Sequence, residues 1–293
     1  MFKFMVYFSA ISVNLIHCLP SKNNTADYDS GGADLSYLGR SVFGEPNEES
    51  GKRVEQWNKS SKVKPQELGT YAEGDILFPN DGKRNGVISE TARWPNGVVP
   101  FQFGGMFSKE QKEMIKKAMM EFHKATCIRF RRREPNDTNW FWITNNRTGC
   151  WASIGRISRP QAINLQAPIC VHHETIMHEL LHTIGFGHEQ SRSDRDSYVT
   201  IHWANIAKEY ENAFKKAEKN LSTSFGIPYD YNSVMHYSNE AFSKNGNWTI
   251  TAKGNSSMLL GPRNGFTEND IKQINLMYNC TKQNSSDIDI DIM

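Results

Sequence analysis

Apolar residues return every three or four positions in several stretches of the chain, which predicts helices. One such helix begins after Ser108, which forms a capping box with Gln111 in the first turn. Its apolar face consists of Met114, Ile115, Ala118, Met119 and Phe122. Another helix is expected to begin at residues 172–174, and one capped by Thr267 to continue to about residue 277. A further helix is expected over residues 204–217.

Shorter apolar runs predict strands between these helices. Residues 98–103 contain Pro100, and because proline cannot donate to a strand ladder, this run is expected at a sheet edge. Further strands are predicted at residues 128–130, 140–143, 162–165 and 249–251. The pattern is therefore that of a globular domain from Asn85 onward.

The first 84 residues have a different pattern. Lys3 precedes an apolar run over residues 4–16, too short to span a bilayer, which predicts a secretory signal over residues 1–18. A buried N-terminal strand is the alternative. Residues 19–84 are polar with little periodicity, a composition that forms a core poorly, and end in the dibasic pair Lys83-Arg84. We expect a propeptide that is cut between Arg84 and Asn85, although an arm that stays attached fits too.

Composition limits the classes of partner that the protein can bind. The 293 residues carry a net charge of +2, and the basic run at residues 129–133 is followed by Glu134 and Asp137, so we read it as a solvated strand end. No nucleic-acid partner is expected. Beyond the N-terminal run no stretch is long and apolar enough for a membrane span. Residues 281–293 form an acidic tail after a domain over residues 85–280.

Cysteines and glycosylation sequons fit an extracellular protein. Cys18 would leave with the signal, and four cysteines remain, at positions 127, 150, 170 and 280. An even number in a secreted chain predicts two disulfides, with three possible pairings. The candidate glycosylation sites are Asn23, Asn58, Asn136, Asn146, Asn220, Asn247, Asn255, Asn279 and Asn284.

Residues 178–189 carry the clearest chemical signal. His178 and His182 are four apart and project from one face of a helix, where two neutral imidazoles can bind one divalent ion. Gly185 can end the helix and let His188 reach the same ion. Three histidines and one open position are the ligand set of a catalytic zinc, although the spacing alone also allows cobalt or copper. Glu179, beside the first ligand, can take a proton from water held there.

The full pattern H-E-x-x-H-x-x-G-F-x-H-E resembles the astacin family of metzincin proteases. A chance match in a chain of this length has a probability on the order of one in tens of thousands. Residues 228–237 match a second block of the family, and the resemblance covers roughly residues 83–280. It implies an α+β, metzincin-like domain with one zinc ion, a twisted mixed sheet, an active-site helix and a cleft between two subdomains.

The resemblance also implies roles for single residues. It pairs Cys127 with Cys280 and Cys150 with Cys170. Tyr237 matches the tyrosine that serves as a fifth zinc ligand at rest and then steadies the tetrahedral intermediate, while a packed core tyrosine is the alternative. Met235 matches the Met-turn residue beneath the histidines. Glu189 matches the acid that holds the new N-terminus after activation; from the residues alone it is equally a surface acid.

Residues 72–76 are, from the residues alone, a glycine turn with flanking acids. Propeptides of the astacin family carry F-x-G-D, whose aspartate binds zinc in place of water. Gly74 and Asp75 match this motif, whereas the phenylalanine position holds Ala72, with Tyr71 just before it. We therefore expect Asp75 to be a zinc ligand in the zymogen only; the alternative is a solvated turn carboxylate.

These features predict a secreted zinc endopeptidase, made as a zymogen and released by an activating protease, that hydrolyses extended protein substrates with Glu179 as general base. Three alternatives exist. A zinc-binding module without turnover is disfavoured because Glu179 and Tyr237 are both present. A matrixin-type protease is disfavoured because residues 19–84 contain no cysteine. A disulfide-stapled structural protein without metal is the third, and no residue selects the biological substrate.

Overall fold

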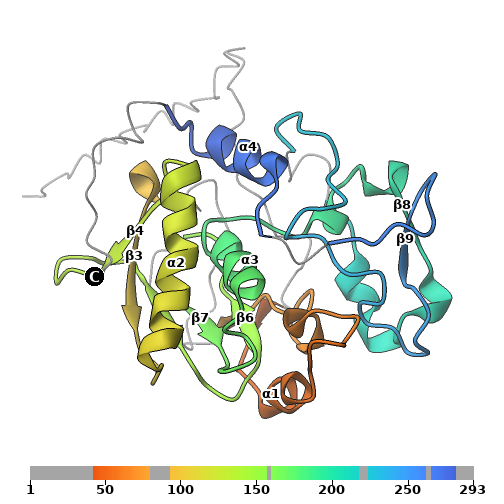
Figure 1. Ribbon diagram of the computed structural model, residues 1–293, viewed down its shortest axis with the longest axis horizontal. Coiled ribbons are helices and arrows are strands. Elements are labelled where there is room, and N and C mark those ends of the chain that lie inside the picture. The colour runs from red at the N-terminus through yellow and green to blue at the C-terminus, as the bar shows by residue number, and fades with distance from the viewer. Residues whose placement is uncertain (1–41, 80–92, 157–159, 218–223, 262–264, 282–293) are drawn as a thin grey trace, which may run out of the picture.

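The computed structural model describes residues 42–79, 93–156, 160–217, 224–261 and 265–281. The expected signal, the Arg84–Asn85 junction and residues 282–293 lie outside these ranges. A five-stranded sheet with the order β4-β3-β5-β7-β6 organises the first half (Figure 1). Only the pairing of β6 with β7 is antiparallel, so the sheet is mixed. Its strands are β3 (Val98–Phe103), β4 (Arg129–Arg132), β5 (Phe141–Thr144), β6 (Cys150–Ala152) and β7 (Gln161–Leu165).

The prediction of an edge strand at Val98–Phe103 is wrong, because β3 lies between β4 and β5. Pro100 is opposite Arg131 of β4, whereas pairing with β5 begins only at Phe101. At Pro100 the strand therefore has one neighbour, and proline's missing N–H removes no bond to β5. Proline is tolerated in an interior strand at such a position.

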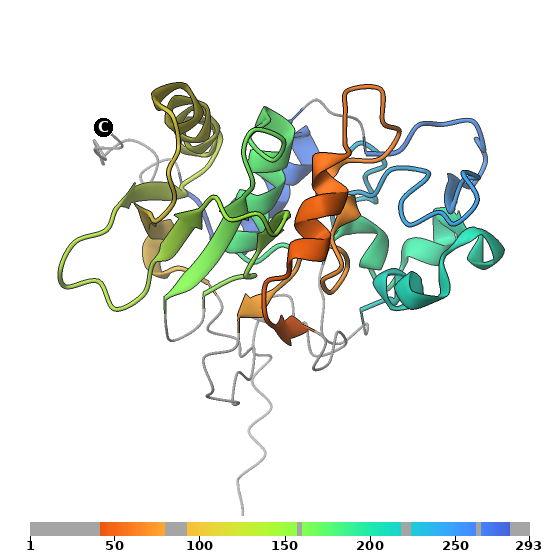
Figure 2. The ribbon, with the colours of Figure 1, turned by 90° about the horizontal axis from the view of Figure 1, so that it is seen from below.

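Two helices cover one face of the sheet (Figures 1 and 2). Helix α2 (Lys109–Ala125) starts at the expected capping box, where Ser108 accepts from the backbone of Gln111. It packs beside helix α3 (His173–Thr183), which also contacts β6 and β7. The side chains of Ile115, Met119 and Phe122 are buried in the main core, as their helical spacing predicted, whereas Met114, predicted for the same face, is 39% exposed.

The second half contains little regular structure. Strands β8 (Val199–Ile201) and β9 (Ile250–Ala252) form a small antiparallel pair over a second core. The expected helix over residues 204–217 is replaced by two 3₁₀ helices, Trp203–Asn205 and Lys208–Phe214. The N–H of Ala207 donates to the carbonyl of Phe242, so a tertiary contact takes the donor that a continuous helix would use. Helix α4 (Glu268–Met277) follows the second half, behind its Thr267 cap.

Residues 42–79 were expected to form a core poorly, and this is wrong. They contain strands β1 (Phe43–Gly44) and β2 (Phe78–Pro79), helix α1 (Glu48–Glu55) and a 3₁₀ helix at Pro65–Leu68. The segment lies between the sheet half and the second half in both views (Figures 1 and 2). Val54 of α1 is fully buried in the main core. The segment also supplies four of the five buried residues of a smaller cluster, Val42, Ala72, Ile76 and Phe78, which pack with Ile154.

Two disulfides fix the chain, Cys127–Cys280 and Cys150–Cys170, which is the pairing that the resemblance implied. None of the helices in the described ranges is sufficiently long and apolar to cross a bilayer. The first disulfide ties Cys280, three residues beyond α4, to Cys127, two residues before β4, across 153 residues, and the second spans 20. Chain entropy therefore makes the first bridge the more stabilising one.

Replacing both Cys127 and Cys280 by alanine should lower the free energy of unfolding by roughly 4–5 kcal/mol, against about 3 kcal/mol for the Cys150 and Cys170 pair. The larger loop restricts the unfolded chain more. Urea unfolding of the two double variants and the parent chain measures both values. An equal or reversed order would show that contacts around the bridges, and not loop length, set their contribution.

Candidate active site

Helix α3 and the turn after it bring three histidines together. His178 and His182 lie one helical turn apart, with ring centroids 4.7 Å from each other. The helix ends at Ile184, and Gly185 has a φ of +106°, a left-handed conformation that favours glycine. The chain then turns back, so the His188 ring lies 5.2 Å from His178 and 4.8 Å from His182. All three rings are buried.

Asp75 of the N-terminal segment is the fourth member of this cluster. Its Oδ2 lies 2.9 Å from Nε2 of His178, and its Oδ1 lies 3.4 Å from Nε2 of His182 and of His188. One potential ligand atom from each of the four residues falls within 4.8 Å of every other. Three imidazoles and a carboxylate are a tetrahedral zinc ligand set.

Unpaired atoms show that the cluster fits a metal ion. Among the described residues, Nε2 of His182 and Oδ1 of Asp75 are buried with no hydrogen-bond partner. The opposite ring nitrogens are held: Nδ1 of His178 by the Val234 carbonyl at 3.0 Å, and Nδ1 of His182 by the Phe186 carbonyl at 2.7 Å. Such outer contacts orient metal-binding histidines. The inward nitrogens are thus left for a cation.

The charges of the cluster lead to the same conclusion. Burial by itself would raise the pKa of the Asp75 carboxyl, but the charges of His188 and His182 and a hydrogen bond to His178 hold it well below its usual range. Burial lowers the pKa of His178 to about 3, whereas Asp75 and Glu73 outweigh burial at His188 and raise its pKa to about 9. The buried carboxylates favour a positive charge here, and a divalent ion supplies it while leaving the imidazoles neutral.

Glu179 lies on α3 next to the first histidine. Its side chain is fully buried, and within the described part of the chain neither carboxyl oxygen has a hydrogen-bond partner. Burial, together with the negative charge of Asp75, raises its pKa well above the ordinary value. A buried carboxyl with free oxygens beside a metal cluster has the surroundings of a proton carrier.

Tyr237 and Met235 lie two residues apart in the chain, and Tyr237 contacts the cluster. The Tyr237 ring centroid is 4.8 Å from that of His188, and its hydroxyl donates to the Glu73 carbonyl at 2.7 Å. Met235 is buried in the main core, and its carbonyl accepts from the N–H of Glu189. The structure therefore brings Tyr237 to the cluster with its hydroxyl held by the N-terminal segment.

Sequence reasoning missed Glu73, which it saw only as an acid in a turn. The Glu73 carboxylate lies 2.6 Å from Nδ1 of His188 and accepts from the Ser191 hydroxyl at 2.8 Å. It is thus the outer partner of the third histidine, as carbonyls are of the other two. Its place two residues before Asp75 is the only sequence signal that pointed to it.

Glu189 is buried, so the interpretation as a surface acid does not hold. Its Oε1 lies 2.8 Å from Nη1 of Arg192 and accepts from the N–H of Asp230 at 2.8 Å. Burial raises its pKa to about 7 in spite of the Arg192 charge. Arg192 supplies the cation that a buried carboxylate needs in this arrangement.

The N-terminal segment also adds to the free edge of the sheet. Ile76 bridges to Ala152 of β6 in the parallel sense. The N–H of Leu77 donates to the Ala152 carbonyl at 3.1 Å, and the N–H of Ala152 donates to the Asp75 carbonyl at 2.9 Å. Asp75 therefore reaches the histidines from a backbone that is fixed to the sheet edge.

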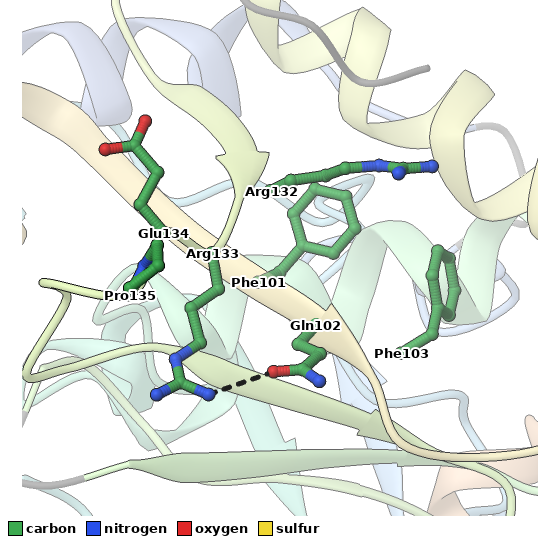
Figure 3. Close-up of a pocket in the computed structure, with 7 residues that line it drawn as sticks. All are labelled: Phe101, Gln102, Phe103, Arg132, Arg133, Glu134 and Pro135. Atoms are coloured by element: carbon green, nitrogen blue, oxygen red, sulfur yellow. Dashed lines mark hydrogen bonds between the residues drawn. The ribbon is translucent and has the colours of Figure 1, made fainter.

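A separate hollow of about 660 Å³ lies at the opposite edge of the sheet, over β3 and β4 (Figure 3). Its lining includes Arg133, which donates to Gln102 and lies 3.6 Å over the ring of Trp140. The rings of Phe101 and Phe103 lie on the other side of β3 from Gln102 and Arg133 (Figure 3). None of the clustered ligand atoms lies here, so the hollow is distinct from the metal cluster.

The basic run around this hollow is largely paired within the protein. Arg131 makes two hydrogen bonds to the carboxylate of Asp137, at 2.6 and 2.7 Å. Arg129 was expected to be solvated, but it is buried and donates to the Thr126 and Ile128 carbonyls. These contacts agree with a structural role for the run.

The glycosylation candidates divide by position. The asparagines at 23, 220 and 284 lie outside the described residues, as do Arg84 and Asn85. The side chains of the others are exposed: Asn58, Asn136, Asn146, Asn247, Asn255 and Asn279. Exposure is necessary for glycan attachment.

Comparison with known proteins places this site in a family. Residues 86–279 match the family model for astacin, a family of peptidases. The zinc metalloproteinase nas-4 of Caenorhabditis elegans is 36% identical, over 73% of this chain and 70% of that protein. The zinc metalloproteinase nas-8 of Steinernema carpocapsae is 39% identical, over 80% of this chain and 58% of that protein.

A solved structure agrees with the sequence comparisons. High choriolytic enzyme 1, a hatching-enzyme zinc protease from Oryzias latipes, matches with a TM-score of 0.60 and 38% identity. The match covers 64% of this chain and 94% of that structure, and it shows the α+β astacin-like fold that the sequence predicted. With its buried cluster of three histidines and an aspartate, this chain belongs to the astacin family of zinc metalloendopeptidases.

Proposed function

We propose that the chain is a secreted zymogen whose activated form hydrolyses peptide bonds of extended protein substrates, with Glu179 as general base. The observation that carries the proposal is Asp75, which lies within 3.4 Å of all three histidines and fills the fourth position of their cluster. In a catalytic zinc site this position is open to water or substrate. A carboxylate fixed there competes directly with both.

A zinc ion held by His178, His182 and His188 would supply Lewis acidity and lower the pKa of water towards ~7. Glu179 would accept a proton from the attacking water and pass it to the leaving amine. Burial and the Asp75 charge raise its pKa, so departure of Asp75 would lower that pKa and favour the ionised form, which can accept a proton. The Tyr237 hydroxyl, released from the Glu73 carbonyl, would donate to the developing oxyanion and could bind as a fifth ligand at rest.

The proposed domains are a signal over residues 1–18, a propeptide over 19–84, a catalytic domain over 85–280 and a tail over 281–293. An activating protease would cut after Arg84. The new ammonium at Asn85 would then pair with Glu189, whose present partner is Arg192. Burial raises the pKa of Glu189 to about 7, so a second cation nearby would favour its charged form.

Two features support secretion. Both disulfides would persist in an oxidising compartment. The asparagines of the described sequons are exposed to solvent, as glycan attachment requires. Peptide substrates would bind as an added strand at the β6 edge, where Leu77 and Ala152 now pair.

Digestion of casein by the full chain and by the chain cut after Arg84 tests this function. The cut chain should digest casein, a chelator should abolish the digestion, and added Zn²⁺ should restore it. The uncut chain should be inactive under the same conditions. A cut chain that is folded and loaded with zinc, yet leaves casein and a peptide library intact, would contradict the proposal.

A further inference from the structure

The N-terminal segment buries a lysine beside the metal cluster. Lys64 is only 5% exposed. Its ammonium donates to the His236 carbonyl oxygen at 2.7 Å and to that of Val234 at 3.4 Å. Burying an ammonium is unfavourable unless carbonyl or carboxylate oxygens surround it, so these two oxygens form a cation-binding site. We call the Val234 and His236 carbonyl oxygens, with the space beside Gly261, the Lys64 site.

The Lys64 site is next to the reactive centre. The Val234 carbonyl that accepts from Lys64 is also the oxygen that contacts Nδ1 of His178, at 3.0 Å. A single carbonyl therefore separates the ammonium from a metal-binding histidine. Asp75, which occupies the cluster, comes from the same segment eleven residues later. A peptide in the cleft can thus present a side chain to this site while its backbone lies at the metal.

The site does not depend on Lys64 for its shape. His236 is held by its N–H to the Ser233 carbonyl and by its Nε2 to the Tyr229 hydroxyl at 2.7 Å. Ser233 in turn donates to Asp270 of α4 at 2.6 Å. These contacts involve only residues after Asn85, and they hold the two carbonyls in place. The site should therefore remain when residues before Asn85 leave.

Gly261 provides the room for the ammonium. A Cβ at this position would lie 2.2 Å from the His236 carbonyl oxygen and 2.7 Å from the Lys64 ammonium. Any side chain there would meet the occupant. A second lysine of the segment, Lys62, is 72% exposed and lies 2.9 Å from the carboxylate of Glu240, which is 13% exposed. Two lysines that are two residues apart in the segment thus meet oxygens of the second half.

We infer that the Lys64 site is a substrate subsite that takes a lysine or arginine side chain close to the scissile bond. This inference rests on the proposed function and names its substrate class: extended peptides with basic residues. In the described part of the chain, the Lys64 ammonium donates to the His236 carbonyl. Once the segment is removed, this donor is lost, and the fixed oxygens of the site can bind another cation. Glu240 adds a preference for a second basic residue two positions away.

Kinetics on matched peptides test the inference. Residues 83–84 of the full chain are replaced by a cleavage site for a protease that does not cut after basic residues. Traces of this activating protease then cannot imitate a preference for lysine. One peptide that the cut enzyme cleaves is then varied at three positions on either side of the bond. Each position receives lysine, Nε-acetyl-lysine or glutamate. At one position lysine should raise kcat/KM about tenfold over acetyl-lysine, which keeps the stem and lacks the charge.

A binding measurement separates this inference from the proposed function. The cut Glu179→Gln protein, loaded with zinc, should bind the lysine peptide about tenfold more tightly than its acetylated partner. If casein is digested but neither kinetics nor binding favours lysine, the inference is overturned and the proposed function stands. If casein is not digested yet binding favours lysine, the proposed function is overturned, and the Lys64 site stands as a binding site for basic side chains but not as a substrate subsite. If casein is not digested and binding does not favour lysine, the proposed function and the inference are both overturned.

Glu240→Gln provides a test from the side of the enzyme. It should narrow the kcat/KM difference between a Lys-x-Lys peptide and the same peptide with the outer lysine acetylated. Glu211→Gln, which removes an exposed glutamate of the same half, is the control for net charge. An equal effect of both variants would mean that Glu240 acts only through long-range charge and would overturn its assigned contact.

Discussion

Replacing Asp75 by alanine in the uncut chain should release peptidase activity without any cleavage. The carboxylate contacts all three histidines and excludes water from their fourth position. A charge-assisted contact of this kind contributes roughly 1.5–3 kcal/mol, so the net loss of even one should raise the open fraction by at least roughly 10–100-fold. Activity should remain below that of the cut enzyme, because Lys64, Glu67 and the β6 pairing still hold the segment in the cleft. Initial rates on a quenched peptide, before and after cutting, measure the change.

Two further variants show whether the effect belongs to the metal contact. Glu45→Ala removes an exposed acid of the same segment and should leave the uncut chain inactive. Glu73→Gln weakens the outer contact to His188 and should give a smaller rise than Asp75→Ala. If the wild-type uncut chain digests the peptide as fast as the cut form, residues 19–84 are not inhibitory and the zymogen proposal fails.

Glu179→Gln should reduce kcat of the cut enzyme by at least about 10²–10⁴-fold while leaving zinc content unchanged. Glutamine has nearly the same shape but cannot accept and return a proton. The substitution should not destabilise the folded state. A carboxyl whose pKa is raised on folding destabilises the fold above its unfolded pKa, and Glu179 is buried with such a pKa shift. Its replacement by a neutral group therefore should not lower the melting temperature at pH 7.

The control for this variant is Glu174→Gln, on the same helix and outside the metal cluster. It should keep activity on casein within a small factor of the parent. Zinc per chain by elemental analysis and the melting temperature show that both variants are loaded and folded. Activity of Glu179→Gln near that of the parent would exclude Glu179 as the general base.

The metal cluster was predictable because its information is local. The spacing of His178 and His182 sets one face of a helix, and Gly185 sets the return of His188, so few residues suffice. The disulfide pairing was not local: the residues alone allowed three pairings, and only the family resemblance selected one. The capping boxes at Ser108 and Thr267 were likewise found, because each is written in four consecutive residues.

The errors arose where distant contacts decide the structure. Pro100 indicated an edge strand, but the strand order depends on where β5 starts to pair. Residues 42–79 lack a periodic apolar pattern because they bury single residues such as Val54 into a core built by others. Glu73 and Lys64 escaped notice for the same reason, since their partners are more than a hundred residues away.

The pairing of Ile76 and Leu77 with β6 has a consequence for storage at high concentration. While it persists, the Ala152 N–H and carbonyl are bonded within the chain, and this edge of the sheet is closed to other molecules. Once the segment leaves, the N–H and carbonyl of Ala152 lose these partners, and unpaired backbone groups at a sheet edge promote association between copies of a protein. The uncut chain should therefore remain monodisperse at concentrations where the activated enzyme self-associates.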